Sequence, residues 1–569
     1  MSEPDMDTSS RDRLRPIAQT LPADVLCELY FTAARSDPPV RKHAIRPYIP
    51  PIQKNAAKEP LGPTWSQIPA VGTRRNDYIR PTSAHTAHEG SLGWILLTHV
   101  CSQWRSVGLS LSSLWGDVFS MFPKVASTLL SRARDAPLTF DMEFLSSLQP
   151  NPFQPCDYLS SFENLARQHL SSAGTMTFAP LGEPSWSWTI KLLYHHEFPL
   201  LKDLRAQVSY IPFMHPDYET SVPLAPSLKR LVLNVFIPFT APNLTNLELT
   251  RLDASKGDEV LTLLRSSPLL EELLLQWNRA SRSSPFVNHF GNVHLPRLTT
   301  ALFTGIPGAL AFTRNLDIPS HADLGFTTYS LLDLPSLLDT IGPRMSDSGA
   351  NCFSFSSSCD ADVFAASIYQ PEKETSPRIF ITVSQPELSL ENRLAFFHEI
   401  LIRTNPDRIV SLHVDPCTYM SMSPLEDMVN TVLNGLRALS ALISLSVACV
   451  PIAREWPFLE ALRGSSNPDL HTFAPALETL TIFSDDTLLD KDFTKTEAEC
   501  VQHRWDRIIF VLEHRQKIGL PLRRLELEGA RGDDPEIASI NASGFARAAV
   551  FVDEVIDNRK DHALIVVES

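Results

Sequence analysis

Residues 226–233 read Pro226-Ser227-Leu228-Lys229-Arg230-Leu231-Val232-Leu233, a proline followed by x-Leu-x-x-Leu and then by alternating apolar residues. Apolar residues at every second position predict a strand with one buried face. The first leucine precedes this strand, so we expect it to lie in a turn that faces the same core. One such unit cannot bury its own leucines, and the phrase therefore predicts several units stacked side by side.

The same phrase recurs along the chain. It begins at Pro199, Pro226, Pro242, Pro268 and Pro475, and it returns in shortened form at Leu522-Arg523-Arg524-Leu525-Glu526-Leu527. The first shared leucines of the first four copies are 27, 16 and 26 residues apart (Leu201, Leu228, Leu244, Leu270). Most of these steps fall within the period of about 20–29 residues that is typical of leucine-rich repeats.

Segments with helical apolar spacing precede several of these strands, so each unit is predicted to be helix, turn, strand. These segments are residues 258–266, 390–404, 425–439 and 501–517. Residues 285–385 lose the phrase except for the weak echo Pro296-Arg297-Leu298. We expect an irregular α/β array of about ten units with parallel strands on a concave face. The alternative is an ordinary α/β domain whose buried strands happen to begin with leucine.

Three apolar fragments lie nearer the N-terminus. They are Leu21-Pro22-Ala23-Asp24-Val25-Leu26-Cys27-Glu28-Leu29, Leu96-Leu97-Thr98-His99-Val100-Cys101-Ser102-Gln103-Trp104-Arg105 and Leu111-Ser112-Ser113-Leu114-Trp115. Apolar spacing predicts one helix over residues 21–34 and a second over residues 92–109. Both carry more apolar surface than a short hairpin can cover, which predicts a partner. The alternative is a generic helical hairpin around a buried tryptophan.

A proline-rich segment separates the first two fragments. Residues 36–90 contain nine prolines (positions 38, 39, 47, 50, 51, 60, 63, 69 and 81) and few apolar clusters. Such a density of proline forbids continuous helix and predicts an extended, solvated insertion. Residues 1–20 are polar and are expected to be disordered.

Read in order, the three fragments resemble an F-box, the helical module with which substrate receptors of cullin-type ubiquitin ligases dock onto the Skp1 adaptor. The insertion and the sequel Leu130-Ser131-Arg132-Ala133-Arg134-Asp135-Ala136-Pro137-Leu138 are similar to the F-box proteins that are numerous in mushroom-forming fungi. The resemblance implies a set of residues that line or support the Skp1 surface, with the last two closing the small core: Leu21, Pro22, Val25, Leu26, Leu29, Leu96, Val100, Cys101, Trp104, Leu114 and Trp115.

The resemblance also implies a domain organisation and a function. Residues 21–120 would form the F-box domain, residues 121–197 a linking segment with the start of the repeats, and residues 198–569 the leucine-rich-repeat-like solenoid. The chain would recruit a Skp1-like adaptor, and through it a cullin, while the repeats hold an unidentified target protein. It would need no cofactor and perform no chemistry itself. The alternatives are a scaffold that promotes no degradation and an α/β enzyme with an unfamiliar site.

Composition narrows the partners. The net charge of −15 offers no basic surface for a phosphate backbone, so we expect no nucleic acid. No apolar run reaches the roughly eighteen residues of a membrane span, and the polar N-terminus does not read as a secretory signal. Eight cysteines without C-x-x-C spacing are typical of reduced thiols. We therefore expect a cytoplasmic or nuclear protein that does not bind membranes.

The sequence holds no specific catalytic or metal-binding motif. The adjacent histidines of Tyr194-His195-His196-Glu197 could join in binding a metal, but neighbours on a strand point to opposite faces and rarely reach one ion. We therefore expect a solvated turn before the strand at residues 200–205. Ser484-Asp485-Asp486 is predicted to be a turn after a strand. Arg205, Trp277 and His413 are better candidates for target contact, although Trp277 suits a core position equally well.

Overall fold

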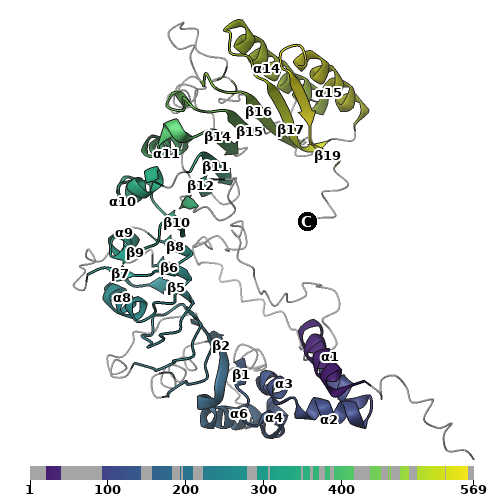
Figure 1. The fold of residues 1–569 in the computed structure, drawn as a ribbon, viewed down its shortest axis with the longest axis vertical. Coiled ribbons are helices and arrows are strands. Elements are labelled where there is room, and N and C mark those ends of the chain that lie inside the picture. Colours follow the sequence, from purple (N-terminus) through teal and green to yellow (C-terminus); the bar gives the residue numbers. More distant parts are fainter. Residues whose placement is uncertain are drawn as a thin grey trace, which may run out of the picture. The chain divides into compact units, whose positions relative to one another are not determined.

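The computed structural model describes most of the chain outside its N-terminus and several loops. The described residues are 21–39, 92–141, 157–181, 193, 196–208, 222–278, 291–305, 308–347, 350–358, 363–370, 378–384, 390–415, 436–449, 459, 462, 474–485, 496–531 and 534–561. The chain divides into two compact units, Met1–Leu247 and Glu248–Ser569. Both contain helices and mostly parallel strands (Figure 1), which confirms the predicted α/β class. The predicted disordered residues 1–20 and most of the predicted insertion lie outside the described residues.

The first unit begins with short helices. Their bounds are Ala23–Ser36 (α1), Gly93–His99 (η5, a 3-10 helix), Ser102–Ser110 (α2), Ser112–Asp117 (α3), Phe119–Met121 (η6), Pro123–Val125 (η7) and Ala126–Ala133 (α4). The prediction of one helix over residues 92–109 was wrong, because the backbone of Cys101 is extended between η5 and α2. Arg105 crosses this break and donates from Nε to the carbonyl of Thr98 at 3.2 Å. That bond satisfies a carbonyl at the end of η5 that a continuous helix would have used.

Four parallel strands follow in chain order. They are Leu138–Asp141 (β1), Ala173–Leu181 (β2), Asp203–Val208 (β3) and Arg230–Leu233 (β4), with helices Asp157–Gln168 (α6) and Leu170–Ser172 (η8) between the first two. The segment expected to link the domains thus already contains two parallel strands. Side chains join the helices to β1: Thr139 Oγ1 donates to Asp117 at 3.3 Å, and Ser120 Oγ accepts from the N–H of Asp141 at 2.9 Å.

The second unit continues with strands that are parallel except for β12. In spatial order they are Asn246–Leu252 (β5, which contains the boundary), Glu272–Trp277 (β6), Thr300–Thr304 (β8), Asp323–Thr328 (β10), Ile379–Ser384 (β13), Val363–Tyr369 (β12), Cys352–Ser358 (β11), Ser411–Asp415 (β14), Ser444–Cys449 (β15), Thr479–Asp485 (β16), Arg524–Arg531 (β17) and Glu554–Asp557 (β18). β12 runs antiparallel to both β11 and β13. This meander lies within residues 285–385, where the sequence phrase is lost.

Three short strands lie outside this series. Val293–His294 (β7) and Leu316–Asp317 (β9) pair with each other, and Lys560–Asp561 (β19) pairs with β17.

Helices connect several of these strands. Their bounds are Gly257–Arg265 (α8), Gly308–Thr313 (α9), Leu334–Asp347 (α10), Leu390–Arg403 (α11), Glu497–Lys517 (α14) and Pro535–Ala548 (α15), with the 3-10 turns Ala254–Lys256, Leu331–Asp333 and Pro406–Arg408. The helices predicted at residues 258–266, 390–404 and 501–517 are confirmed. Residues 425–435 of the fourth lie outside the described residues. Within residues 222–245 no helix joins the strands, so helix, turn, strand is not the rule for every unit.

The recurring phrase forms one recurring turn. Wherever the phrase has its full form, with proline and the leucine two positions later, the carbonyl of the residue before proline accepts the N–H of that leucine. The pairs are Phe198/Leu201, Ala225/Leu228, Ala241/Leu244, Ser267/Leu270, Leu295/Leu298 and Ala474/Leu477. All twelve residues are at most 2 % exposed. Proline suits the second position of such a turn because its φ is already fixed there. Pro296-Arg297-Leu298 is therefore a full copy, and Leu439/Leu442 forms the same turn without proline.

Backbone hydrogen bonds link each unit to the next. One carbonyl accepts two successive N–H groups from the following unit, as at Lys202 from Lys229 and Arg230, at Val410 from Ile443 and Ser444, at Ile443 from Glu478 and Thr479, and at Glu478 from Arg523 and Arg524. The donor residue of one step is the acceptor of the next. The expected stacking of turn-and-strand units is thus present in the backbone itself.

Candidate functional site

An aromatic cluster forms the core of the N-terminal helices. The rings of Tyr30 and Trp104 lie 5.9 Å apart, and Trp94 packs edge-on against both Tyr30 at 6.2 Å and Trp115 at 4.9 Å. Tyr30 donates its hydroxyl to the carbonyl of Trp104 at 2.8 Å, and Trp115 donates Nε1 to the carbonyl of Gly108 at 2.9 Å. Burial raises the pKa of Tyr30 to about 12, with a smaller contribution from Cys101. The cluster joins α1 to η5, α2 and α3.

Backbone contacts also close the module around residues 40–91. The carbonyl of Asp37, just past α1, accepts the N–H of Trp94 at 3.2 Å. Gly93 has a φ of +52°, and a Cβ there would lie only 2.4 Å from the Asp37 oxygen. Gln103 on α2 donates to the carbonyl of Leu21 at 2.8 Å. The two ends of the intervening segment therefore meet, and α1 packs with the helices that follow it.

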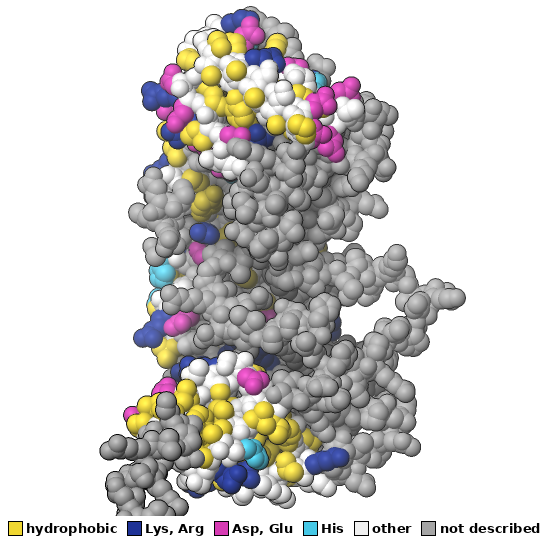
Figure 2. Space-filling view, turned by 90° about the vertical axis from the view of Figure 1, so that its right-hand side faces the viewer, with side chains coloured by type: hydrophobic (Ala, Val, Ile, Leu, Met, Phe, Trp, Pro, Cys, Tyr) yellow, Lys and Arg dark blue, Asp and Glu magenta, His cyan; other side chains and the backbone are white. Residues whose placement is uncertain are grey.

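Apolar side chains remain exposed on this module. The exposed fraction is 39 % for Val25, 40 % for Leu29, 53 % for Leu96 and 50 % for Val100. We call these four residues the apolar surface. Val25 and Leu29 are one turn apart on α1, so they share a face. Hydrophobic side chains gather over this module at the lower end of the view in Figure 2. Several exposed apolar side chains on one small module are typical of a protein-interaction site.

The apolar surface is a distinctive feature of the described residues. Of their sixteen exposed large hydrophobic side chains, seven lie between Val25 and Val125. Leu92 and Leu109, 44 % and 36 % exposed, belong to this set and were missed from the sequence. Leu92 lies four residues before Leu96, so its spacing could have revealed it. Leu109 lies near the end of α2 and does not continue that spacing.

The eleven residues singled out by the family resemblance divide into two groups. Pro22 and the four residues of the apolar surface are exposed, and Leu21 and Cys101 are half-buried. Leu26, Trp104, Leu114 and Trp115 are at most 8 % exposed and support the surface from beneath. Tyr30 and Trp94 complete that core and were also missed. Tyr30 follows Leu26 by one helical turn, so its spacing could have revealed it.

The candidates for target contact fare differently. Trp277 is 5 % exposed and packs edge-on against Phe312 at 5.4 Å, so it belongs to the core. Arg205 is exposed and lies 3.5 Å from Asp203. His413 is half-buried, with Nδ1 2.9 Å from the hydroxyl of Ser446. His195 and Asp486 lie outside the described residues. The turn predicted at Ser484-Asp485 was wrong, because β16 continues through Asp485.

Other kinds of site require different chemical groups. The residues described contain no group of three or more His, Cys, Asp or Glu side chains placed to hold a metal ion. Across those same ranges no helix has both the length and the apolar character needed to cross a membrane. Cys27, Cys101, Cys352 and Cys500 are free thiols.

No protein-family model matches the chain, and no curated protein matches it either.

Proposed function

We propose that this chain is the substrate-recognition adaptor of an SCF-type ubiquitin ligase. The N-terminal helices bind a Skp1-like adaptor, which connects to a cullin, and the strand-and-helix array holds a target protein as a leucine-rich-repeat domain. The observation that carries the proposal is the apolar surface. The aromatic core of Tyr30, Trp94, Trp104 and Trp115 lies beneath it and joins α1 to the later helices, even though a long segment separates α1 from η5. Burying the side chains of the apolar surface on binding stabilises the complex by roughly 25 cal/mol per Å² of apolar surface removed from water.

The first unit offers a firm base for such docking. Phe119 in η6 packs against Phe140 of β1 at 5.5 Å and Phe162 of α6 at 5.2 Å. Together with the hydrogen bonds of Asp117 and Ser120 to β1, these rings tie the helices to the first strands. A receptor that acts by proximity works better when its docking module is rigidly attached to its first strands. Rigid attachment restricts the positions of a bound target and raises the target's effective concentration near the ligase.

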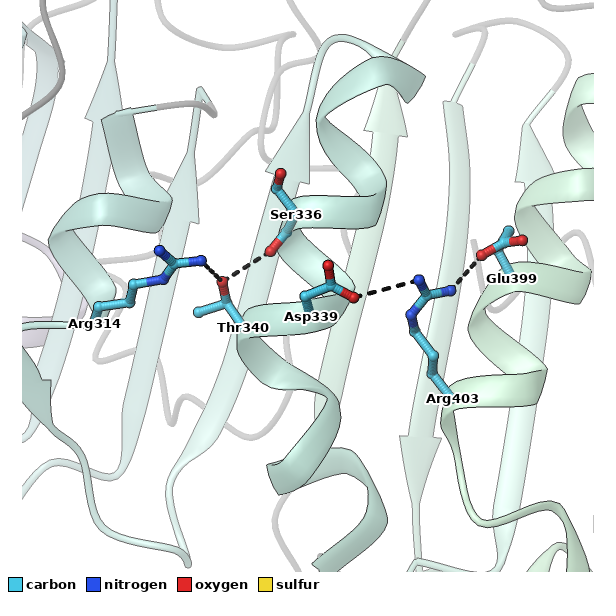
Figure 3. Close-up of polar contacts among 6 residues, drawn as sticks. All are labelled: Arg314, Ser336, Asp339, Thr340, Glu399 and Arg403. Atoms are coloured by element: carbon cyan, nitrogen blue, oxygen red, sulfur yellow. Dashed lines mark hydrogen bonds and ion pairs between the residues drawn. The ribbon is translucent and has the colours of Figure 1, made fainter.

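Polar contacts also hold neighbouring helices in the second unit. Arg314, just after α9, donates to Thr340 Oγ1 of α10 at 3.1 Å, and the Thr340 hydroxyl donates to the carbonyl of Ser336. Arg403 of α11 binds Asp339 of α10 at 3.3 Å and Glu399 of its own helix (Figure 3). These contacts fix the lateral spacing of α9, α10 and α11. They support a stacked array that presents its strands as a continuous surface.

Capture of a Skp1-like adaptor by the purified full-length chain tests the proposal. We expect Leu29→Asp combined with Val100→Asp to abolish capture, because two charges would be desolvated at the contact. Leu332→Asp and Val550→Asp are matched controls, since these side chains are exposed elsewhere (90 % and 70 %). Leu26 and Trp104 are unsuitable, because replacing a buried residue would damage the module itself.

The outcomes separate the candidate functions. Failure of the wild-type chain to capture the adaptor would sink the proposal, as would unchanged capture by the double variant. Co-purification of a cullin and ubiquitin transfer to a bound protein distinguish a ligase adaptor from a scaffold that uses the same surface.

A further inference from the structure

Strands β14–β17 carry a polar row whose members satisfy one another. His413, Ser446, Thr481 and Glu526 are register partners on successive strands. His413 is hydrogen-bonded to Ser446, and Thr481 Oγ1 donates to Glu526 Oε2 at 3.3 Å. Leu480 and Ile482, on either side of Thr481 in β16, are fully buried on the opposite face. The row therefore marks the face of these strands that lies away from the core.

The row two residues further along the same strands contains an exposed aromatic ring, Phe483. Phe483 is paired in register with Ala448 of β15 on one side and with Glu528 of β17 on the other. Its ring is 43 % exposed, although it belongs to the interior of a sheet. Neighbouring strands are about 4.8 Å apart, so the ring and the Glu528 carboxylate stand side by side. An aromatic ring beside a carboxylate is suited to bind a cation, because the ring face and the carboxylate are both negative.

Local charge favours the same kind of ligand. Arg524, two strand positions before Glu526, lies 3.3 Å from Glu526 and 2.8 Å from Glu554, so its positive charge is already shared. Among the described residues Glu528 forms no ion pair. The whole chain carries a net charge of −15.

We propose that Phe483 and Glu528 form a docking site for an arginine or lysine side chain of a basic protein segment. The cationic head lies against the Phe483 ring and pairs with Glu528. The inference rests on the proposed function, because the basic segment would belong to the target protein that the array holds.

Fluorescence anisotropy with the full-length chain tests this site. The probe is a labelled peptide of four Arg-Ser repeats, and a Glu-Ser peptide of equal length is the negative control. We expect Phe483→Ala and Glu528→Gln each to weaken binding of the Arg-Ser peptide about three- to ten-fold. Glu528→Lys should remove binding, because it places a like charge at the contact.

Two control variants separate the site from the overall negative charge. Phe510→Ala removes an equally exposed ring (44 %) from α14, and Glu497→Gln removes an exposed carboxylate from the same helix. Both should bind the peptide as the wild type does. Equal losses in the site and control variants, or no loss in either site variant, would overturn the proposal. Skp1 capture should be unchanged in the Phe483 and Glu528 variants, so failure of the adaptor proposal would be seen separately.

Discussion

Tyr30 holds the N-terminal core together through both its ring and its hydroxyl. The hydroxyl is buried against Trp104, and ionisation there would leave a charge without water, which is why its pKa rises to about 12. The unfolded chain releases this proton near the ordinary value of 10.0. The folded state therefore binds the proton more tightly, and the contribution of Tyr30 to stability is complete below pH 10 and is lost as the pH rises toward 12.

Tyr30→Phe tests this account. Below pH 10 we expect the variant to be less stable by about 1 kcal/mol, because the Trp104 carbonyl loses its donor. Between pH 10 and 12 the wild type should lose stability more steeply than the variant, so the difference should shrink. Urea unfolding at several pH values measures both quantities. Parallel pH dependences of the two proteins would contradict the assignment.

At the scale of elements, Gly93 determines how η5 meets the end of α1. Its φ of +52° disfavours side chains, and a Cβ would also strike the Asp37 backbone. Gly519 has a φ of +76°, and no atom lies within 4 Å of the place that a Cβ would occupy, so it isolates the conformational cost. We expect Gly519→Ala to cost about 1–2 kcal/mol and Gly93→Ala distinctly more, with weaker Skp1 capture. Thermal unfolding of both variants provides the comparison, and equal losses would show that the contact with Asp37 is unimportant.

Sequence patterns succeeded for elements whose partners are local. The phrase Pro-x-Leu-x-x-Leu located the turns and their strands because proline, the turn bond and the alternation all act within eight residues. The antiparallel strand β12 was missed, because pairing of β10 with β13 depends on residues far apart in the chain. In the candidate site, α1 was predicted to within two residues at each end. The break at Cys101 was missed because an unbroken apolar spacing continues across it, and the bond that stabilises the break comes from Arg105.

At the scale of the whole molecule, the N-terminal helices and the first strands share one core rather than meeting through a linker. Phe119 is completely buried between Phe140 of β1 and Phe162 of α6, two elements that follow α4 in the sequence. Truncating such a ring removes buried area and leaves a cavity, at a cost of about 3–5 kcal/mol. Phe119 contacts both the helices and the first strands, so its truncation should lower the stability of both together.

Hydrogen exchange measured on peptides of the full-length chain distinguishes a shared core from two independent ones. In Phe119→Ala, amides of α3 and of β1–β2 should lose protection by similar amounts, since opening of either exposes the same cavity. Phe545→Ala is a control in the second unit, because this half-buried ring of α15 packs against Trp505 of α14 at 5.0 Å. It should reduce protection in α14 and α15 and leave β1–β2 unchanged. Loss confined to the helices in Phe119→Ala would mean that the strands fold without them, and the docking module would then be a separate attachment rather than the first layer of the array.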